Sequence, residues 1–184
     1  MANAARWIRL DPTGPCGLHA ACEGLARSQD RRAQPILLWA RTRAPAIGDL
    51  LRSGEDQFSF ALIVPLRLAP GRISRWRAWG LSPALATYRH FGVRAYLDDD
   101  AIWLNGRKIG DGGAQAINGC AVIVSGFLPR RPDSHTDWAE PELETVFRGR
   151  IEAQHGWQFD NSWPSAREQA AIADALVVED IDAR

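Results

Sequence analysis

The chain has 184 residues, enough for one hydrophobic core, so its length predicts a single domain spanning residues 1–184. Lysine and arginine together number 22, as do aspartate and glutamate, so the formal net charge is zero and no overall field attracts nucleic acid. No apolar run approaches the roughly 20 residues that cross a bilayer, and residues 1–6 lack the apolar core of a signal peptide. We therefore expect a cytoplasmic protein with neither a nucleic-acid nor a membrane partner.

The three cysteines, Cys16, Cys22 and Cys120, are odd in number and scattered along the chain. This pattern indicates reduced thiols rather than a disulfide framework, in agreement with the cytoplasm. Cys16 and Cys22 have only His19 between them as a further ligand, which matches no usual zinc spacing. The sequence predicts no metal site.

The first half of the chain alternates between helical and strand patterns. Leu18, Cys22 and Leu25 recur at helical spacing, and a short apolar run follows a charged turn. Large apolar residues then alternate with smaller ones until Pro65 ends the run. The predicted elements are a helix at Gly17–Arg27, a strand at 34–39, a strand at Gln57–Val64 and a helix at Arg72–Phe91 that contains Pro83 and stops at Gly92.

A tight hairpin is the firmest local prediction. Asn105-Gly106 separates two apolar stretches, Ile102–Leu104 and Arg107–Ile109. Asn and Gly tolerate the positive φ angles that a type I′ turn requires at both central positions, and the twist of this turn matches the flanking strands.

The second half begins with glycines and ends with helices. Gly110–Gly113 predicts a flexible loop, and Cys120–Phe127 predicts a nearly all-apolar strand. A linker at Pro129–Asp137 precedes two predicted helices, at Pro141–His155 and at Ser165–Leu176. Ser165 and Glu168 have the spacing of a capping box at the start of the second of these.

These elements predict an α+β fold with a central mixed, mainly antiparallel sheet. Its strands are expected near residues 35–40, 57–64, 93–97, 101–110 and 120–127. We expect the helices to flank this sheet and to pack on one side of it.

The run Asp98–Gly110 resembles the lysine-bearing strands of the biotin/lipoate protein ligase family, which includes biotin ligases, lipoate-protein ligase A and octanoyltransferases. In that family an Asn-Asp pair, an apolar strand and a tight turn lead to a lysine, an apolar residue and glycine. Residues 17–48 resemble the family's first helix and strand, and 151–172 its helix-strand-helix end. The resemblance implies the fold of class II aminoacyl-tRNA synthetases and biotin synthetase.

The resemblance also implies a role for Lys108, which would contact the ligand carboxylate and the phosphate of an acyl-adenylate. Joining a carboxylic acid to ATP brings two anions together, so such a site needs a fixed cation and glycines that let the backbone approach phosphate. The alternative is an ordinary exposed lysine beside a plain glycine loop. The further cofactor-binding residues implied are Arg52, Ser53, Gly54, Gly110, Gly112 and Gly113.

Three departures from the family favour impaired catalysis. Only Leu51–Asp56 stands where the family has a longer arginine- and glycine-rich adenylate loop, and Glu55 and Asp56 add negative charge there. In the gapless register Ala101 replaces the family's aspartate, whereas a one-residue shift would put Asp100 in that position, so either metal support is lost or the strand is offset. Cys120 lies in an apolar strand, typical of a buried side chain rather than the nucleophile of octanoyl and lipoyl transferases.

Two functions therefore stay open. One is an enzyme that activates or transfers a biotin-, lipoate- or octanoate-type acyl group, using ATP with Mg, onto an acceptor (carrier) protein. The other is a non-catalytic protein of the same fold, which binds a small carboxylic acid or serves as a partner subunit. The fingerprints of serine hydrolases, P-loop proteins and dinucleotide-binding proteins do not occur in the sequence.

Overall fold

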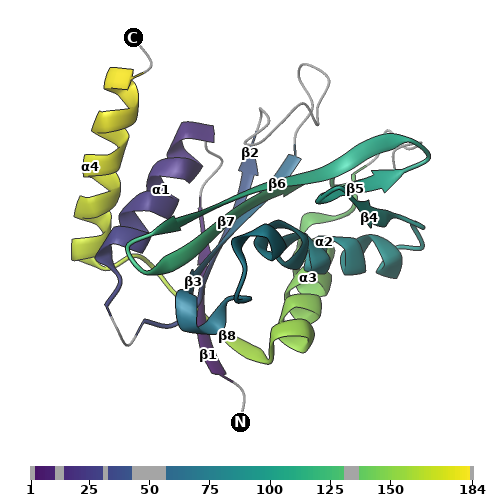
Figure 1. Cartoon of the computed structure of the whole chain (residues 1–184). Helices are drawn as coiled ribbons and strands as arrows, with labels where there is room; N and C mark the ends of the chain where they lie inside the picture. Colours follow the sequence, from purple (N-terminus) through teal and green to yellow (C-terminus); the bar gives the residue numbers. More distant parts are fainter. Residues whose placement is uncertain (1–2, 11–14, 31–32, 43–56, 131–136, 183–184) are drawn as a thin grey trace.

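The computed structural model describes residues 3–10, 15–30, 33–42, 57–130 and 137–182. The strands of this part form one sheet in the order β4-β5-β6-β7-β3-β2-β1-β8 (Figure 1). The strands are β1 (Asn3–Arg9), β2 (Ile36–Thr42), β3 (Gln57–Pro65), β4 (Tyr96–Asp98), β5 (Ala101–Leu104), β6 (Arg107–Ile117), β7 (Cys120–Phe127) and β8 (Trp157–Asn161). The helices are α1 (Pro15–Ser28), α2 (Trp76–His90), α3 (Glu140–His155) and α4 (Ala166–Asp182), with short 3₁₀ turns at Leu66–Leu68 and Ile73–Arg75.

The sheet is mixed, because β1 runs parallel to both β2 and β8 while every other pair is antiparallel. The predicted α+β class and the mainly antiparallel sheet are confirmed. Strand β1 was not predicted, whereas β8 lies within 151–172, where the resemblance implies a helix-strand-helix end. The two strands extend the sheet at one edge.

Three two-residue turns connect β4, β5, β6 and β7 into a meander. Asn105 and Gly106 have φ angles of 50° and 75°, so the predicted type I′ hairpin is confirmed. Asp99-Asp100 and Asn118-Gly119 also have positive φ angles at both positions and join β4 to β5 and β6 to β7.

The prediction of a flexible loop at Gly110–Gly113 is wrong, because these residues lie inside β6. Their lack of a side chain serves close packing instead. A Cβ atom on Gly110 would lie 2.9 Å from Ile102 Cδ1, and one on Gly112 would lie 3.0 Å from Ser125 Oγ. Glycine at these two positions therefore allows the neighbouring strands to pack closely and does not form a turn.

Helices cover both faces of the sheet, so the prediction of helices on one side is wrong (Figure 1). Helices α2 and α3 pack on one face over an aromatic core in which Phe127 stacks on Phe147 and Trp39 stacks on Phe58. Helix α1 packs on the other face, over an aliphatic layer from β2, β3 and β7, and α4 packs mainly against α1.

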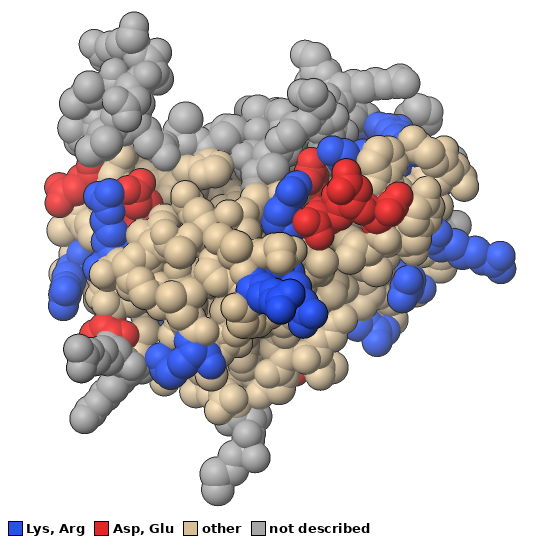
Figure 2. Space-filling view, viewed as in Figure 1, with Lys and Arg blue, Asp and Glu red and all other residues tan. Residues whose placement is uncertain are grey.

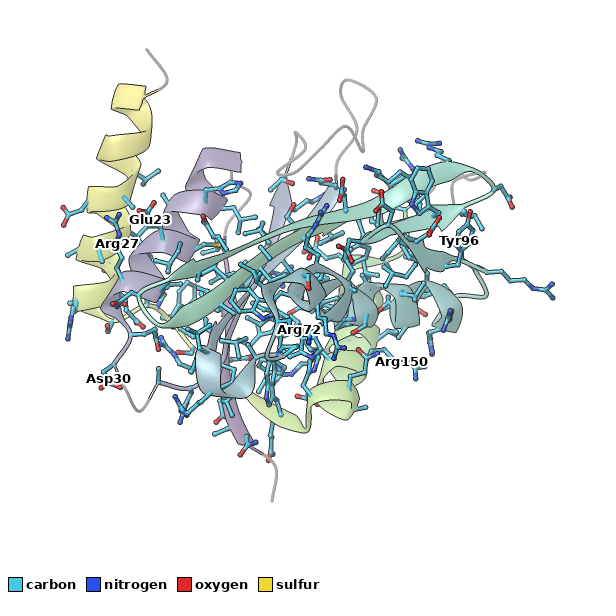
Figure 3. All side chains as sticks on the ribbon, in the orientation of Figure 1. Glu23, Arg27, Asp30, Arg72, Tyr96 and Arg150 are labelled. Atoms are coloured by element: carbon cyan, nitrogen blue, oxygen red, sulfur yellow. The ribbon has the colours of Figure 1, made fainter. Side chains whose placement is uncertain are left out.

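The predicted capping box at the start of α4 is confirmed. The Ser165 N–H donates to Glu168 Oε2 at 2.7 Å, and the Glu168 N–H donates to Ser165 Oγ at 3.4 Å. Glu168 also forms an ion pair with Arg6 of β1, with Nη1 and Oε1 2.5 Å apart. On the outer side of α1, Glu23 pairs with Arg27 one turn later (Figure 3). The ends of the described chain are thus tied together through β1 and α4.

Charged side chains of both signs lie on the surface in separate groups with uncharged areas between them (Figure 2). None of the helices in the described ranges is long and apolar enough to span a membrane.

His155 makes the stability of the fold depend on pH. Burial against the rings of Trp79 and Trp157 lowers the pKa of His155 from 6.5 to about 4. Below pH 6.5 the unfolded chain binds a proton at this residue that the folded protein does not bind. The free energy of unfolding should therefore fall as the pH drops from 6.5 to 4, by up to about 3 kcal/mol, and this contribution should then level off.

Denaturant titrations at several pH values between 6.5 and 4.5 measure this slope. A His155→Gln variant should show a flatter dependence, because glutamine does not titrate. The exposed His90 provides a matched site for the same substitution, and His90→Gln serves as the control. Equal slopes for wild type and His155→Gln would contradict the assignment. Glu168 affects the stability at lower pH. Burial raises its pKa, but Arg6 and Ser165 outweigh this effect, so the pKa of Glu168 in the folded protein is lowered from 4.5. The stabilising contribution of Glu168 is therefore lost only as the pH falls below 4.5.

Candidate functional site

Lys108 lies at a β-bulge in β6. Trp103 of β5 pairs with Lys108, but the preceding Ile102 pairs with Gly110, so Ile109 is the extra residue between two normal pairs. In a regular strand, residues three apart point to opposite faces of the sheet. The bulge removes this alternation, so the side chains of Lys108 and Asp111 meet.

Asp111 is a buried carboxylate held by two cations. Lys108 Nζ lies 3.0 Å from its Oδ2, and Arg77 Nη2 from α2 lies 3.4 Å from its Oδ1. Arg77 Nε also donates to the Gly112 carbonyl at 2.7 Å, and the Gly112 N–H donates to Asp111 Oδ1 at 2.8 Å. Because two cations face one carboxylate, the cluster has a net positive charge and can attract a further anion.

Tyr88 of α2 stabilises the bulge through a hydrogen bond to its extra residue, Ile109. Its buried hydroxyl lies 2.9 Å from the Ile109 carbonyl and 2.8 Å from the Leu128 carbonyl. Burial raises the pKa of Tyr88, so the hydroxyl remains protonated and can donate. The extra residue of the bulge is therefore fixed by a side chain, and with it the direction of the neighbouring Lys108.

A Tyr88→Phe variant should lose about 1–2 kcal/mol of unfolding free energy, because two buried carbonyls lose their shared donor while the ring still fills its space. Chemical denaturation measures this loss. Tyr96→Phe is the control, since Tyr96 is exposed and its hydroxyl should contribute nothing measurable. If both variants are as stable as wild type, Tyr88 does not support the bulge.

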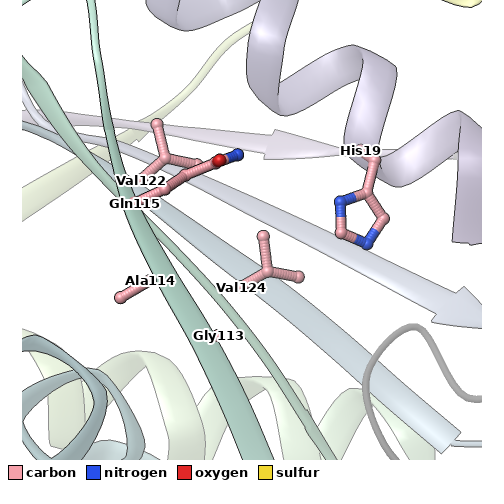
Figure 4. A pocket seen from close by; sticks show the side chains of 6 residues that line it. All are labelled: His19, Gly113, Ala114, Gln115, Val122 and Val124. Atoms are coloured by element: carbon pink, nitrogen blue, oxygen red, sulfur yellow. The ribbon is translucent and has the colours of Figure 1, made fainter. Parts of the chain in front are cut away.

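An apolar pocket of about 300 Å³ lies further along β6 and β7, against α1 (Figure 4). Residues two apart on a strand point to the same face of the sheet, so Asp111 and Gly113 share a face. Val124 pairs with Gly113 across β6 and β7 and therefore lies on that face too. The pocket and the Asp111 carboxylate thus lie on the same face of β6. Gly113 is about 7 Å along the strand from Asp111. The pocket is lined by His19, Gly113, Ala114, Gln115, Val122 and Val124.

The predicted glycines take different places. Gly113 lines the pocket, Gly110 is packed between strands, and the Gly112 N–H is engaged by Asp111. A phosphate at Gly112 would thus have to displace a carboxylate. Arg52, Ser53 and Gly54 fall outside the described residues.

A buried polar group was missed by the sequence analysis. Thr42 Oγ1 lies 2.8 Å from Ser59 Oγ, and Gln57 Nε2 donates to Ser59 Oγ at 3.3 Å, with all three side chains fully buried. Thr42 and Gln57 flank the segment 43–56, and Ser59 is in register with Gly126 beside Asp111. Polar residues at the adjoining ends of two apolar strands were the available signal.

Cys120 is buried, as predicted. Burial raises the pKa of its thiol, against the smaller opposing effect of Arg67, so the thiolate is disfavoured at neutral pH. A nucleophilic role for Cys120 receives no support from this environment.

Lys108 is also the only lysine of the chain, since the other 21 basic residues are arginine. The sequence analysis did not use this signal. An ammonium group is a compact charge with three rotatable donors, unlike the planar guanidinium.

The mixed sheet with helices on both faces defines an α+β domain. No protein-family model matches the chain, and no curated protein matches it. Solved structures do match, and they confirm at the level of the fold the resemblance carried by residues 98–110.

The structure is similar to an archaeal lipoylation system from Thermoplasma acidophilum, which comprises a bipartite lipoate protein ligase and its E2 lipoyl domain. The TM-score is 0.76 at 11% identity, over 95% of this chain and 92% of that one. Lipoate-protein ligase A bound with ATP gives a TM-score of 0.71 at 13% identity, over 95% and 94%. Biotin protein ligase from Aquifex aeolicus, in complex with biotin and ATP, gives 0.54 at 11% identity, over 82% and 69%. The chain has the fold of lipoate and biotin protein ligases.

Proposed function

We propose that this protein binds a lipoate- or octanoate-type carboxylic acid along β6 and β7, as part of a reaction that attaches the acyl group to a carrier protein. The apolar part of the acid would enter the pocket at Val122 and Val124, and its carboxylate would contact Lys108. One observation carries this proposal: an apolar pocket and the single lysine occupy the same two strands of a ligase fold. A volume of about 300 Å³ is at the small end of ligand pockets, which suits a slender acyl chain.

Lipoate-type acids are favoured over biotin by the comparisons. The lipoate ligases overlap almost completely with this chain, whereas the biotin ligase overlaps over 69% of its own length with a lower TM-score. For adenylation, the described residues offer Lys108 as a phosphate contact, and the proposed loop contacts Arg52, Ser53 and Gly54 would have to supply the rest.

Ligand-induced melting shifts test the proposal. Octanoate, lipoate and biotin are added separately, with and without ATP and Mg, and 1-octanol serves as the control that lacks a carboxylate. A ligand at a hundred times its Kd stabilises the folded state by about 2.7 kcal/mol, which moves the melting temperature by about 5–10 °C for a chain of this size. Octanoate or lipoate should shift it and octanol should not. No shift with any acid would reject the proposal.

A second candidate is binding without catalysis, and it is favoured by the ion pair of Lys108 with Asp111. This resident carboxylate competes with an incoming anion, so adenylation would be weak. Pyrophosphate exchange into ATP, measured in the presence of lipoate, distinguishes the two candidates: exchange indicates a ligase, and binding without exchange indicates the non-catalytic function.

A further inference from the structure

We propose that a rigid surface next to the pocket docks the carrier domain, through an acidic face of that domain with apolar side chains at its centre. This inference rests on the proposed function and adds the place where the partner binds. The surface, called here the docking surface, consists of Leu66, Arg67, Leu68, Arg72, Ile73 and Arg75.

The docking surface exposes large apolar side chains. Leu66, Leu68 and Ile73 are 44%, 37% and 56% exposed, and they make up half of the exposed large hydrophobic residues in the described part of the chain. Scattered exposed apolar residues are ordinary, but three within eight residues are a concentration that indicates an interaction site.

The segment that carries these side chains is held rigidly. The Leu66 N–H donates to the Gly119 carbonyl at 3.0 Å, Arg67 Nη2 donates to the Ala33 carbonyl at 2.9 Å, and Trp76 Nε1 donates to the Pro70 carbonyl at 2.7 Å. Side chains on a fixed backbone lose less entropy on binding, so these exposed side chains are preorganised to bind a partner.

The docking surface is basic. Residues 57–97 contain no aspartate or glutamate, but they contain Arg67, Arg72, Arg75, Arg77, Arg89 and Arg94. Arg72 and Arg75 are exposed and form no ion pair with any residue that the structure describes. Arg72 lies in the middle of the face shown in Figure 3, where Figure 2 shows basic atoms surrounded by uncharged ones. Among the described residues that line the adjoining groove, Asp30 is the acidic one. Charge complementarity therefore calls for an acidic partner.

The position suits a carrier domain. A groove of about 480 Å³, lined by Leu66, Arg67, Gly119 and Cys120 among others, adjoins the docking surface. Cys120 is two residues from Val122 of the acyl pocket, about 7 Å along β7, whereas Lys108 is nine residues from Ile117, the partner of Cys120, or about 30 Å away. A domain of about 100 residues has a radius of gyration of about 13 Å, so its full width is comparable to this distance, and a domain docked here could present its acceptor side chain near Lys108.

Other anionic partners fit less well. The docking surface exposes aliphatic rather than aromatic side chains, whereas single-stranded nucleic acid stacks on aromatic rings. It is built from two short 3₁₀ turns and lacks the amphipathic helix with which proteins lie on membranes.

Binding of an isolated lipoyl carrier domain, followed by calorimetry at two salt concentrations, tests the proposal; a biotinyl carrier domain is run in parallel. The variant Arg72→Glu/Arg75→Glu should weaken binding by about tenfold or more, and Leu66→Ser/Ile73→Ser should also weaken it. Arg89→Glu/Arg94→Glu makes the same charge change at exposed arginines outside the docking surface and should bind as wild type does. Added salt should weaken the wild-type complex.

The docking surface would be overturned if wild type bound neither carrier domain, or if the docking-surface variants bound the carrier domain as well as the control variant does. Phosphatidylserine vesicles and RNA are tested as alternative partners. The proposal would also fail if the docking-surface variants lost binding to vesicles or RNA but kept binding to the carrier domain. The melting shift with octanoate is recorded on the same preparations. If wild type shows that shift and the carrier domain does not bind, the docking inference fails alone. If the shift is absent, the proposed function fails whatever the domain does.

Discussion

Replacing Lys108 by alanine should weaken the binding of octanoate or lipoate by about 1.5–3 kcal/mol, or roughly ten- to a hundred-fold. A carboxylate loses a charge-assisted contact, and the remaining Arg77 is already committed to Asp111 and Gly112. The variant should also lose about 1 kcal/mol of stability, because the buried Asp111 keeps only one cation and Lys108 is itself partly exposed. Calorimetric titration and thermal melting measure the two effects.

Asp111→Asn is the matched variant for this prediction. It removes the resident counterion while leaving Lys108 in place, so it should bind a carboxylate more tightly than wild type. In the double variant Lys108→Ala/Asp111→Asn, this gain should disappear. Tighter binding by the double variant, or equal binding by all four proteins, would show that Lys108 is not the anion contact.

The largest loss of stability is expected from Gly24→Ala. Gly24 of α1 packs directly against α4, and a Cβ atom there would lie 2.5 Å from the Ile172 backbone nitrogen and 2.7 Å from the Ala171 carbonyl carbon. Backbone atoms cannot rotate away as a side chain can, so the two helices must separate. We expect a loss of about 2 kcal/mol or more, seen as a melting temperature lower by about 4–8 °C.

Gly149→Ala is its control. Gly149 lies in α3 with nothing near its added methyl group, so the substitution should raise stability by about 0.5–1 kcal/mol through helix propensity alone. If Gly24→Ala is as stable as wild type, the close approach of α1 and α4 is not a constraint on the fold.

Local patterns predicted the elements that local chemistry determines. The Asn105-Gly106 turn and the Ser165–Glu168 capping box depend on a few neighbouring residues, and both are present in the structure. The helix containing Pro83 was also predicted, because its apolar spacing outweighs a single proline.

Elements held by distant contacts were missed. Strand β1 pairs in parallel with β8 across most of the chain, and its Arg6 forms an ion pair with Glu168 of α4. The glycine run in β6 was assigned to a loop because glycine favours turns, whereas here Gly110 and Gly112 allow side chains of the neighbouring strands to approach closely.

The candidate site was predicted only in part. Lys108 was singled out from the sequence, but its partner Asp111, the support from Arg77 and Tyr88 and the pocket under α1 depend on tertiary structure. A β-bulge cannot be seen in a sequence as short as Arg107–Asp111, and this bulge determines which side chain Lys108 meets.

The single lysine allows a direct measurement of the central claim, that a carboxylate binds at Lys108. Reductive methylation with carbon-13 formaldehyde labels Lys108 and the chain's amino terminus and keeps the positive charge of the lysine. A Lys108→Arg variant, which lacks the side-chain signal, assigns the spectrum. Titration with octanoate should move the Lys108 resonance in a saturable way, and titration with 1-octanol should leave it in place. An unmoved Lys108 resonance at octanoate concentrations that saturate the melting shift would contradict the account.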